Sequence, residues 1–437
     1  MLAMAPFSAG GTDLVVWWDE PYYAEEGDAL KEIIAAFEQK SGKQVDLVFY
    51  PQDELPEKIL ATFEIGTPPD FAFGLSLAGY IGRLAYDDRL VDLSDAVGHF
   101  SDLFDPDVLR WAVWLNASTG QKALYGLPIG RTTYYVHVWK NLLEQSGFSL
   151  EDIPNEWEAF WLFWCDRVQP AARRATGRDD IWGIGLSMAG GVEAQVGFIQ
   201  FLHANAAAYV TPDGRLVVDD PAIRQKLIKV IDSYTAVYRK GCTPPDAVNW
   251  LAGDRNNKAF LAQTVVMTVN ETLSIANALK RERPDDYYEN AATIEWPLGP
   301  TGERFPIQGA VNSAMVFKHG GHATIAKEFV HFLMAEGWLA HYVDFSGERM
   351  LPPMPKLLEA PFWLDPNDPH RMASVMQASS RPVAHDFAQA SGDWRHDVAV
   401  WQEFTWAKAI HRVVADGITP EQAVDEAIAR IKQILSE

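Results

Sequence analysis

The segment VVWWDEPYY, residues 15 to 23, places two indoles, two phenol rings and two carboxylates directly after a short run of β-branched residues. Flat rings can cover the apolar faces of a cyclic ligand, and carboxylates accept hydrogen bonds from its hydroxyl groups. Successive strand residues point to opposite sheet faces, so at most one of the two indoles faces a ligand while the other packs in a core. The first candidate site residues are Trp18, Asp19, Glu20 and Tyr22; the alternative is a core indole followed by solvated turn carboxylates.

Sequence motifs for catalysis, metals and nucleotides are weak. The stretch GIGLSMAG has Met188 where the third glycine of a dinucleotide-binding loop belongs, and no G-x-S-x-G, H-E-x-x-H or Walker lysine pattern occurs. His319 and His322 flank two glycines, and we expect them to be solvated loop residues rather than metal ligands. We therefore expect no cofactor and no metal, although the many carboxylates leave a pair of catalytic acids open.

The composition is that of a folded protein with an acidic surface. The chain has 437 residues, 48% of them hydrophobic, which is enough for two or more cores. Its 37 basic and 59 acidic residues give a formal charge of -22, which disfavours binding to nucleic acid or to anionic lipid. No window reaches the roughly 18 consecutive apolar residues that would span a bilayer.

Two features bear on export. Cys165 and Cys242 are the only cysteines, and they can either form one disulfide or remain two buried thiols. The first residues, MLAMAPFSAGG, have the small residues that end a secretory signal but not the charged and apolar regions that precede them. A trimmed signal and a plain N-terminus both remain open.

The opening elements alternate between strand and helix. Strands are expected at 13–18, in QVDLVFYP and in DFAFGL, with a helix in ALKEIIAAFEQKSG that Gly42 ends and a second helix that Pro56 opens and Gly66 stops. This β-α-β-α-β order predicts a parallel sheet, whose ligand crevice lies at the carboxyl ends of its strands. The opening motif and Ser76 both lie at such ends.

Three extended stretches are expected to cross between lobes. They are LYGLPIGRTTYYVHVWKN from Leu124, ERFPIQGAVNSAMVF from Glu303, and the proline-rich SGERMLPPMP from Ser346. Three crossings would make both lobes discontinuous. A final helix is expected after Thr419 and Pro420, with its apolar stripe along Val424, Ala427, Ile428, Ile431 and Leu435.

The order of these segments resembles the extracellular solute-binding proteins of ABC importers, family 1, the sugar-binding family that includes maltodextrin-binding protein. The matching pieces include DLVVWWDE, IIAAFEQKSGKQVDLVF, GTPPDFAFG, YGLPIGRTTYYVHVWKNLLEQSG, TVVMTVNETL, FPIQGAVNSAMVF and ATIAKEFVHFLM, and they cover nearly the whole chain. Each is degenerate alone, so the order carries the resemblance. The aromatic ladder of the maltodextrin binder is not matched residue for residue.

The resemblance implies an α/β, two-lobed periplasmic-binding-protein fold (type II). The expected lobes are 1–128 with 311–349, and 129–310 with 350–437, joined by a hinge. A carbohydrate, either a mono- or short oligosaccharide or a related polyol, would be held in the cleft by hinge closure and delivered to membrane permease subunits, without covalent chemistry. The protein would be an exported, periplasmic or cell-surface monomer.

The resemblance also suggests further ligand residues. Asn270 and Glu271, in MTVNETL, would face the cleft from the second lobe, where a carboxylate that accepts a sugar hydroxyl contributes ~1.5 to 3 kcal/mol; Glu271 could equally be a residue at a helix start. Arg349 could fork onto hydroxyls or onto an acidic ligand, or form a surface ion pair. The remaining candidates are Gly130, Arg131, Met188, Gly190, Gly309, Asn312 and Glu348.

Three alternatives stay open. A carbohydrate-active hydrolase or lyase would use two acids of the same cleft. The tyrosine pairs at 22, 134 and 287 could ligate ferric ion, although neighbours in a strand diverge, and acidic residues beside aromatic rings would suit a polyamine. The late residues Trp394, Trp401 and Trp406 are expected to pack rather than to touch ligand.

Overall fold

The chain forms two compact units, each made of several chain segments. The computed structural model describes residues 11–52, 54–211, 215–251, 254–335, 337–346, 349–381, 384, 400, 401 and 403–436. Unit 1 comprises Met1–Arg131, Val311–Gly347 and Pro352–Pro355, and unit 2 comprises Thr132–Ala310, Glu348–Leu351 and Lys356–Glu437. The chain therefore passes between the units within each of the three stretches that the sequence marked as crossings.

Unit 1 begins with the expected alternation of strand and helix. Its elements are β1 (Leu14–Asp19), α1 (Ala24–Ser41), β2 (Val45–Tyr50), α2 (Leu55–Ile65) and β3 (Phe71–Phe73). Gly42 and Gly66 end the two helices with φ of 70° and 78°, a left-handed conformation that glycine adopts without steric cost. Strand β1 pairs in parallel with both β2 and β3, so the predicted parallel arrangement is confirmed.

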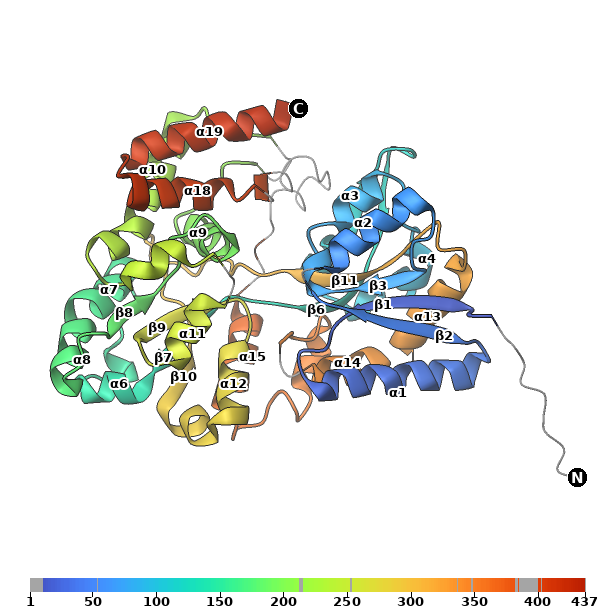
Figure 1. The fold of residues 1–437 in the computed structure, drawn as a ribbon, viewed down its shortest axis with the longest axis horizontal. Helices are drawn as coiled ribbons and strands as arrows, with labels where there is room; N and C mark the ends of the chain where they lie inside the picture. The colour runs from blue at the N-terminus through green and yellow to red at the C-terminus, as the bar shows by residue number, and fades with distance from the viewer. Residues whose placement is uncertain are drawn as a thin grey trace, which may run out of the picture. The chain divides into compact units, whose positions relative to one another are not determined.

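The sheet of unit 1 has five strands in the order β2-β1-β3-β11-β6, where β6 is Leu127–Arg131 and β11 is Val311–Val316. Strand β11 runs antiparallel to β3 and to β6. Helices α1, α13 (Ala323–Ala335) and α14 (Trp338–Phe345) lie on one side of this sheet, and α2 and α3 (Ile81–Tyr86) lie on the other (Figure 1). Phe37 of α1 contacts Phe329 and Phe332 of α13, which closes the core on that side.

The sheet of unit 2 has four strands in the order β10-β7-β9-β8. These strands are β7 (Tyr135–Trp139), β8 (Trp182–Gly185), β9 (Val265–Asn270) and β10 (Ala291–Ile294). Strands β8 and β9 are parallel, whereas β7 is antiparallel to both β9 and β10. All six residues of β9 are buried, as expected for a central strand with both faces covered.

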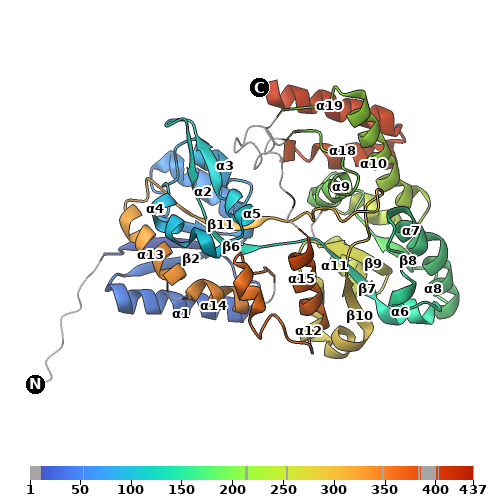
Figure 2. The same ribbon diagram turned by 180° about the vertical axis from the view of Figure 1, so that it is seen from behind.

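Further helices surround this second sheet. Helices α9 (Val192–Ala204), α10 (Pro221–Arg239), α18 (Thr405–His411) and α19 (Pro420–Ser436) pack together beyond one face, as both views show (Figures 1 and 2). The expected start of α19 is confirmed, since the backbone N–H of Gln422 donates to Thr419 Oγ1 while Gln422 Oε1 accepts from the Thr419 N–H. Of its expected apolar stripe, Leu435 is only partly buried, and Ile434 packs in the core.

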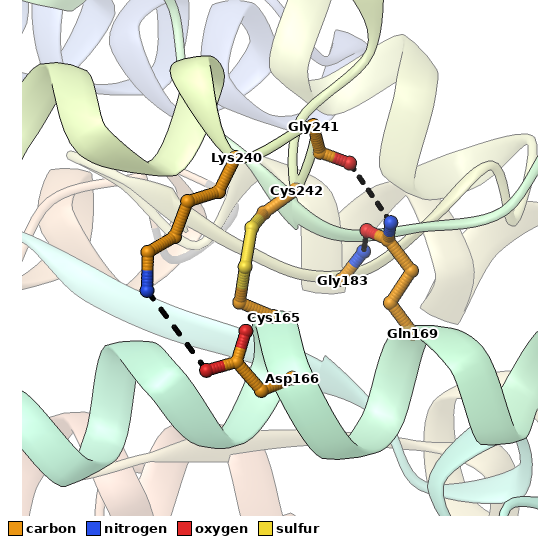
Figure 3. Close-up of a disulfide and its surroundings, with 7 residues drawn as sticks. All are labelled: Cys165, Asp166, Gln169, Gly183, Lys240, Gly241 and Cys242. Atoms are coloured by element: carbon orange, nitrogen blue, oxygen red, sulfur yellow. Dashed lines mark hydrogen bonds and ion pairs between the residues drawn. A yellow bond between two sulfur atoms is a disulfide. The ribbon is translucent and has the colours of Figure 1, made fainter.

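A disulfide joins Cys165 to Cys242, which decides between the two states that the sequence left open. Cys165 lies in a π-helical turn, Phe163–Val168. Cys242 lies shortly after the end of α10, and the two Cα atoms are 5.0 Å apart. Figure 3 shows Gln169 beside it, whose amide donates to the Gly241 carbonyl and accepts from the Gly183 N–H. The bond therefore fixes the loop after Gly241 against the helical layer.

Candidate functional site

Asp19 orders the carboxyl end of β1 rather than standing open to solvent. Its Oδ2 accepts a hydrogen bond of 2.6 Å from the Leu75 N–H, in the turn that follows β3, and its side chain is buried. A Cβ at Gly74 would lie 2.5 Å from Asp19 Oδ1, so only glycine lets the two strand ends approach this closely. Ser76 follows in the same turn, and its Oγ has no hydrogen-bond partner among the residues that the structure describes.

Trp18 packs in the core of unit 1, which corrects the expectation that it faces a ligand. It is 2% exposed, its ring contacts Phe73 and Tyr342, and its indole N–H donates to the Tyr342 hydroxyl over 2.9 Å. This is the core-indole alternative that the sequence left open. Trp17 is the half-buried indole of the pair, with its ring 4.6 Å from that of Tyr50.

Glu20 and Tyr22 lie exposed just beyond β1. Tyr22 is 61% exposed and packs edge-on against Tyr23. Its backbone N–H donates to Glu26 Oε2 over 3.0 Å, and Glu26 Oε1 accepts from Tyr342. This carboxylate in the first turn of α1 thus holds the loop that carries Tyr22.

The candidates at the unit 1 ends of the crossings are buried in its sheet. Gly130 of β6 lies opposite Asn312 of β11, and Arg131 lies opposite Val311. Arg131 and Asn312 are 6% and 2% exposed. Asn312 Nδ2 has no hydrogen-bond partner in the described part of the chain, so its amide keeps a donor that the sheet does not use.

In unit 2, Glu271 lies directly beyond the end of β9 and contacts the first crossing. Its Oε1 accepts a hydrogen bond of 2.8 Å from Thr132 Oγ1. Thr132 Oγ1 in turn accepts from the Ala310 N–H over 3.0 Å, and the Thr132 N–H donates to the Ala310 carbonyl over 2.8 Å. Glu271 is therefore fixed by the paired crossing segments rather than by a helix cap.

Gly309 has a steric role in this pairing. A Cβ at Gly309 would lie 2.3 Å from the Thr132 carbonyl oxygen, a distance that backbone atoms cannot accommodate without moving. Its absence of a side chain is what lets the return crossing lie against the first, and the Tyr134 N–H then donates to the Gln308 carbonyl. The structure therefore explains the glycine at position 309 by the close approach of two backbone segments.

Asn270 ends β9 and uses its side chain in the next turn. Its Nδ2 donates to the Thr272 carbonyl over 2.8 Å and to Ser274 Oγ over 3.0 Å. Ser274 begins α12 (Ser274–Glu282), so Asn270 shapes the turn from the strand into that helix. At this strand end, the Asn270 side chain therefore bonds within the turn, whereas the Glu271 side chain bonds to Thr132 of the first crossing.

Glu193 is a candidate that the sequence analysis missed. It is half-buried in the first turn of α9, and no residue in the described ranges makes a hydrogen bond or ion pair with it. Burial, then the negative charges of Glu271 and Asp254, raise the pKa of Glu193 to about 8, although a helix N-terminus alone would favour its ionised form. Burial also raises the pKa of Glu271, and the Thr132 hydrogen bond opposes that shift.

Two buried tyrosines complete this group, which we call the carboxylate cluster: Glu193, Glu271, Thr132, Tyr134 and Tyr234. Burial, then the charge of Glu193, raise the pKa of both phenols well above their usual value. The Tyr234 hydroxyl donates to the Ser187 carbonyl over 3.0 Å. With its pKa raised to about 8, Glu193 is mainly protonated at neutral pH, so the cluster offers a carboxyl donor beside the Glu271 carboxylate, which Thr132 holds.

The remaining unit 2 candidates are placed differently. Met188 is fully buried in the hydrophobic core, which corrects its assignment as a ligand contact. A Cβ at Gly190 would make an ordinary contact of 3.5 Å with Lys408. Arg349 is half-buried in unit 2, and Glu348 lies outside the described residues.

The side chains weighed for metals and packing are also located. His319 and His322 are exposed, and His322 Nδ1 lies 3.1 Å from Asp70 Oδ2. No group of three or more His, Cys, Asp or Glu side chains could hold a metal ion in the described part of the chain. Trp406 is buried in the unit 2 core and Trp401 packs against it, whereas Trp394 lies outside the described residues.

Solved structures with this fold are numerous. A solute-binding protein from Thermotoga lettingae, bound with α-D-tagatose, has a TM-score of 0.73 at 16% identity and covers 97% of this chain and 100% of its own. Maltose-bound MalE3 of T. maritima has a TM-score of 0.70 at 17% identity, covering 96% and 99%. The GacH receptor of Streptomyces glaucescens, solved unliganded and with acarbose, has a TM-score of 0.73 at 15% identity, covering 97% and 98%. The predicted two-lobed periplasmic-binding-protein fold is thereby confirmed.

The sequence comparisons agree with the fold. No curated protein matches the chain. Residues 32–373 match the family described as bacterial extracellular solute-binding protein, a span that runs from α1 into α15 (Pro369–Ser380) and includes every member of the carboxylate cluster. The family and the fold are those of binding proteins, and the chain belongs to the bacterial extracellular solute-binding proteins.

Proposed function

We propose that this protein is the extracytoplasmic solute-binding component of an ABC importer. Its ligand is a mono- or short oligosaccharide, or a related polyol or sugar derivative, which it delivers to membrane permease subunits. The proteins of similar fold that were solved with tagatose, maltose and acarbose support a carbohydrate ligand. Family membership over residues 32–373 supports solute capture.

The carboxylate cluster is the observation that carries the proposal. Sugar hydroxyls both donate and accept hydrogen bonds, so a site for them needs both kinds of partner at fixed positions. Glu271 is a carboxylate held by Thr132, and Glu193 is a carboxyl whose pKa of about 8 keeps it protonated at neutral pH. In unit 1 we propose Glu20 and Tyr22 as ligand contacts, because both are exposed at the carboxyl end of β1.

The disulfide supports an exported protein. Disulfides persist in oxidising compartments such as the periplasm or the cell surface and are rare in the cytosol. Cys165 and Cys242 are both buried and are bonded to each other. Within the described residues, none of the helices has the length and apolar character needed to cross a membrane.

Calorimetric titration with a panel of mono- and oligosaccharides and polyols tests the proposal. At least one sugar should bind, and Glu271→Gln should weaken it roughly 10- to 150-fold, the loss of one charge-assisted hydrogen bond. The matched control is Glu282→Gln, an exposed glutamate of α12 in the same unit, which should bind like the wild type. Failure of every sugar to bind, or equal loss in both variants, would contradict the proposal.

Recovery of the ligand separates binding from catalysis. A binding protein returns its sugar unchanged after prolonged incubation, whereas a hydrolase using two acids releases products. Chromatography of the bound oligosaccharide after release by denaturation makes the comparison directly. Sustained hydrolysis that stops in Glu271→Gln or Asp19→Asn would replace the transport role with an enzymatic one.

A further inference from the structure

Unit 2 contains a cavity that the proposed sugar site does not use. Its volume is about 310 Å³, at the lower end of the range for small-molecule pockets and enough for a single ring. Two indoles and three charged side chains contribute to its lining, together with a small residue of α11 (Arg255–Leu261). These residues are Trp182, Trp250, Asp246, Arg255, Lys258 and Ala259.

The cavity lies at the amino-terminal ends of β8 and β9, and the carboxylate cluster lies at the carboxyl end of β9. Trp182 is the first residue of β8, and Thr264, which also lines the cavity, directly precedes β9. Glu271 follows the other end of β9, whose six residues rise by ~3.3 Å each, so roughly 20 Å separate the two places. A ligand in the cavity therefore cannot touch Glu271.

The loop that carries one wall of the cavity is fixed before any ligand arrives. This loop runs from Cys242, which the disulfide holds, to Trp250. The Ile184 N–H donates to the Cys242 carbonyl over 2.9 Å, and the Met188 N–H donates to the Ala247 carbonyl over 3.0 Å. Ser187 Oγ donates to the Trp250 carbonyl over 3.1 Å, so both ends of the wall are anchored.

Of the two cationic side chains that line the cavity, Lys258 forms an ion pair and Arg255 forms none with any described residue. The Trp250 indole N–H donates to Asp246 over 3.0 Å, and Lys258 pairs with Asp254 over 2.5 Å, which occupies the nearby carboxylates. Arg173 lies 5.6 Å from the centre of the Trp182 ring and donates to the Ile181 carbonyl. Arg255 is exposed at the cavity and makes no hydrogen bond or ion pair with any residue that the structure describes.

We propose that this cavity binds a small ring compound that carries a carboxylate, with the ring between the indole walls and the carboxylate on Arg255. A guanidinium presents a planar fork that matches a carboxylate, and indoles accept the apolar face of either a sugar acid or an aromatic acid. The charge of -22 on the whole chain acts against an anion, but salt screens charges beyond ~8 Å at physiological ionic strength. Among the charged side chains that line the cavity, Arg255 and Lys258 outnumber Asp246, so the local balance favours an anion.

Titration of the ¹⁵N-labelled protein with sodium glucuronate, sodium benzoate and glucose tests the proposal by NMR. The indole N–H resonances of Trp182 and Trp250, assigned from Trp182→Phe and Trp250→Phe, should shift saturably with at least one of the acids and not with glucose. Arg255→Gln should weaken that binding at least about tenfold. Binding of glucuronate alone or of benzoate alone identifies the source of the carboxylate.

Three further variants locate the binding. Ala259→Leu fills the cavity without changing its charge and should abolish the shifts. Arg224→Gln removes an exposed guanidinium of α10 that pairs with Asp425, and Glu271→Gln alters the carboxylate cluster; neither should change the affinity. Equal shifts with glucose, no saturable shift with either acid, retained affinity in Arg255→Gln, or loss of binding in Glu271→Gln would each overturn the proposal.

Discussion

Glu193 and Glu271 make the acid–base behaviour of the carboxylate cluster measurable. Burial comes first among the causes that raise the pKa of Glu193 to about 8, and the charge of Glu271 comes second. Carboxyl ¹³C chemical shifts should show a titration near pH 8 that Glu193→Gln removes. Glu271→Gln should lower the midpoint but leave it above the value of 4.5 for a solvated glutamate, because burial remains. A midpoint unchanged by Glu271→Gln would show that the two carboxyls do not interact.

Two buried histidines of unit 2 predict loss of stability in acid. Thr293 Oγ1 lies 3.0 Å from His137 Nδ1 and 2.7 Å from His370 Nδ1. Burial lowers the pKa of His137 to about 3 and that of His370 to about 4, against 6.5 when solvated. The unfolded chain therefore takes up protons between pH 6.5 and about 4 while the folded chain does not, so the free energy of unfolding falls as the pH falls through that window.

Denaturant unfolding at a series of pH values checks this expectation. The curve should decline from pH 6.5 towards 4, and His370→Asn should flatten the decline even though it lowers stability at every pH. His341→Asn is a suitable control, because this histidine is more exposed and contacts the exposed carboxylate of Glu32 in unit 1. A decline equally steep in His370→Asn would assign the acid sensitivity to other groups.

Residue-level prediction from the sequence was limited by partners far along the chain. Strand periodicity established that Trp17 and Trp18 point to opposite faces, but the choice between them depends on Tyr342, which hydrogen-bonds Trp18 from 324 residues away. Met188 follows β8 and was expected to contact a ligand, yet it is buried among residues that many segments contribute to the unit 2 core. Glu193 was missed because its proximity to Glu271 arises only when α9 and β9 pack into one unit.

Among the elements, the loop closed by the disulfide should contribute strongly to the stability of unit 2. The two cysteines are separated by 77 positions, and closing a loop of that length lowers the entropy of the unfolded chain, which corresponds to about 4.5 kcal/mol of stability at 25 °C. The double variant Cys165→Ala/Cys242→Ala should therefore lower the free energy of unfolding by several kcal/mol in denaturant titrations. Adding a reductant should destabilise the wild type and leave the double variant unchanged.

The pairing of the two crossing segments in unit 2 depends on Gly309. Gly309→Ala would place a Cβ 2.3 Å from the Thr132 carbonyl oxygen, so the segments must separate at a cost of about 1 to 3 kcal/mol. Thr132 holds Glu271, and sugar affinity should fall together with stability. Gly79→Ala is the control, because its Cβ would meet nothing within 4 Å. Calorimetry showing full affinity in Gly309→Ala would separate the crossing from the binding site.

The first elements were predictable because their signals are local. Gly42 and Gly66 end their helices because the residue after a helix often adopts a left-handed conformation, which suits glycine. Pro56 fits the first turn of a helix because backbone N–H groups there have no acceptor within the helix, so nothing is lost when proline lacks one. The extended stretch from Leu124 was recognised as too long for one strand, and it contains β6 of one unit and β7 of the other. The cap and turn role of Asn270 was not predicted, since it depends on a hydrogen bond to the start of α12.

At the scale of the whole molecule, the chain order explains why both units are discontinuous. Strand β11 belongs to the sheet of unit 1 although 179 residues of unit 2, Thr132–Ala310, precede it. Neither unit can complete its sheet or its helical layers until segments distant in sequence have met. Such long-range contacts favour slow folding, and they make the order of segments along the chain more informative than any single motif.

The proposed capture of a sugar also predicts a change of shape on binding. If the sugar contacts both lobes only when they are closed, it binds that form better and shifts the population towards it. Small-angle X-ray scattering should then show a smaller radius of gyration when the sugar identified by calorimetry is added, at a scattering mass that stays monomeric. Glu282→Gln should show the same decrease, and Glu271→Gln should show a smaller one at a sugar concentration that just saturates the wild type. An unchanged radius in a protein that calorimetry shows to be saturated would mean that capture occurs without closure.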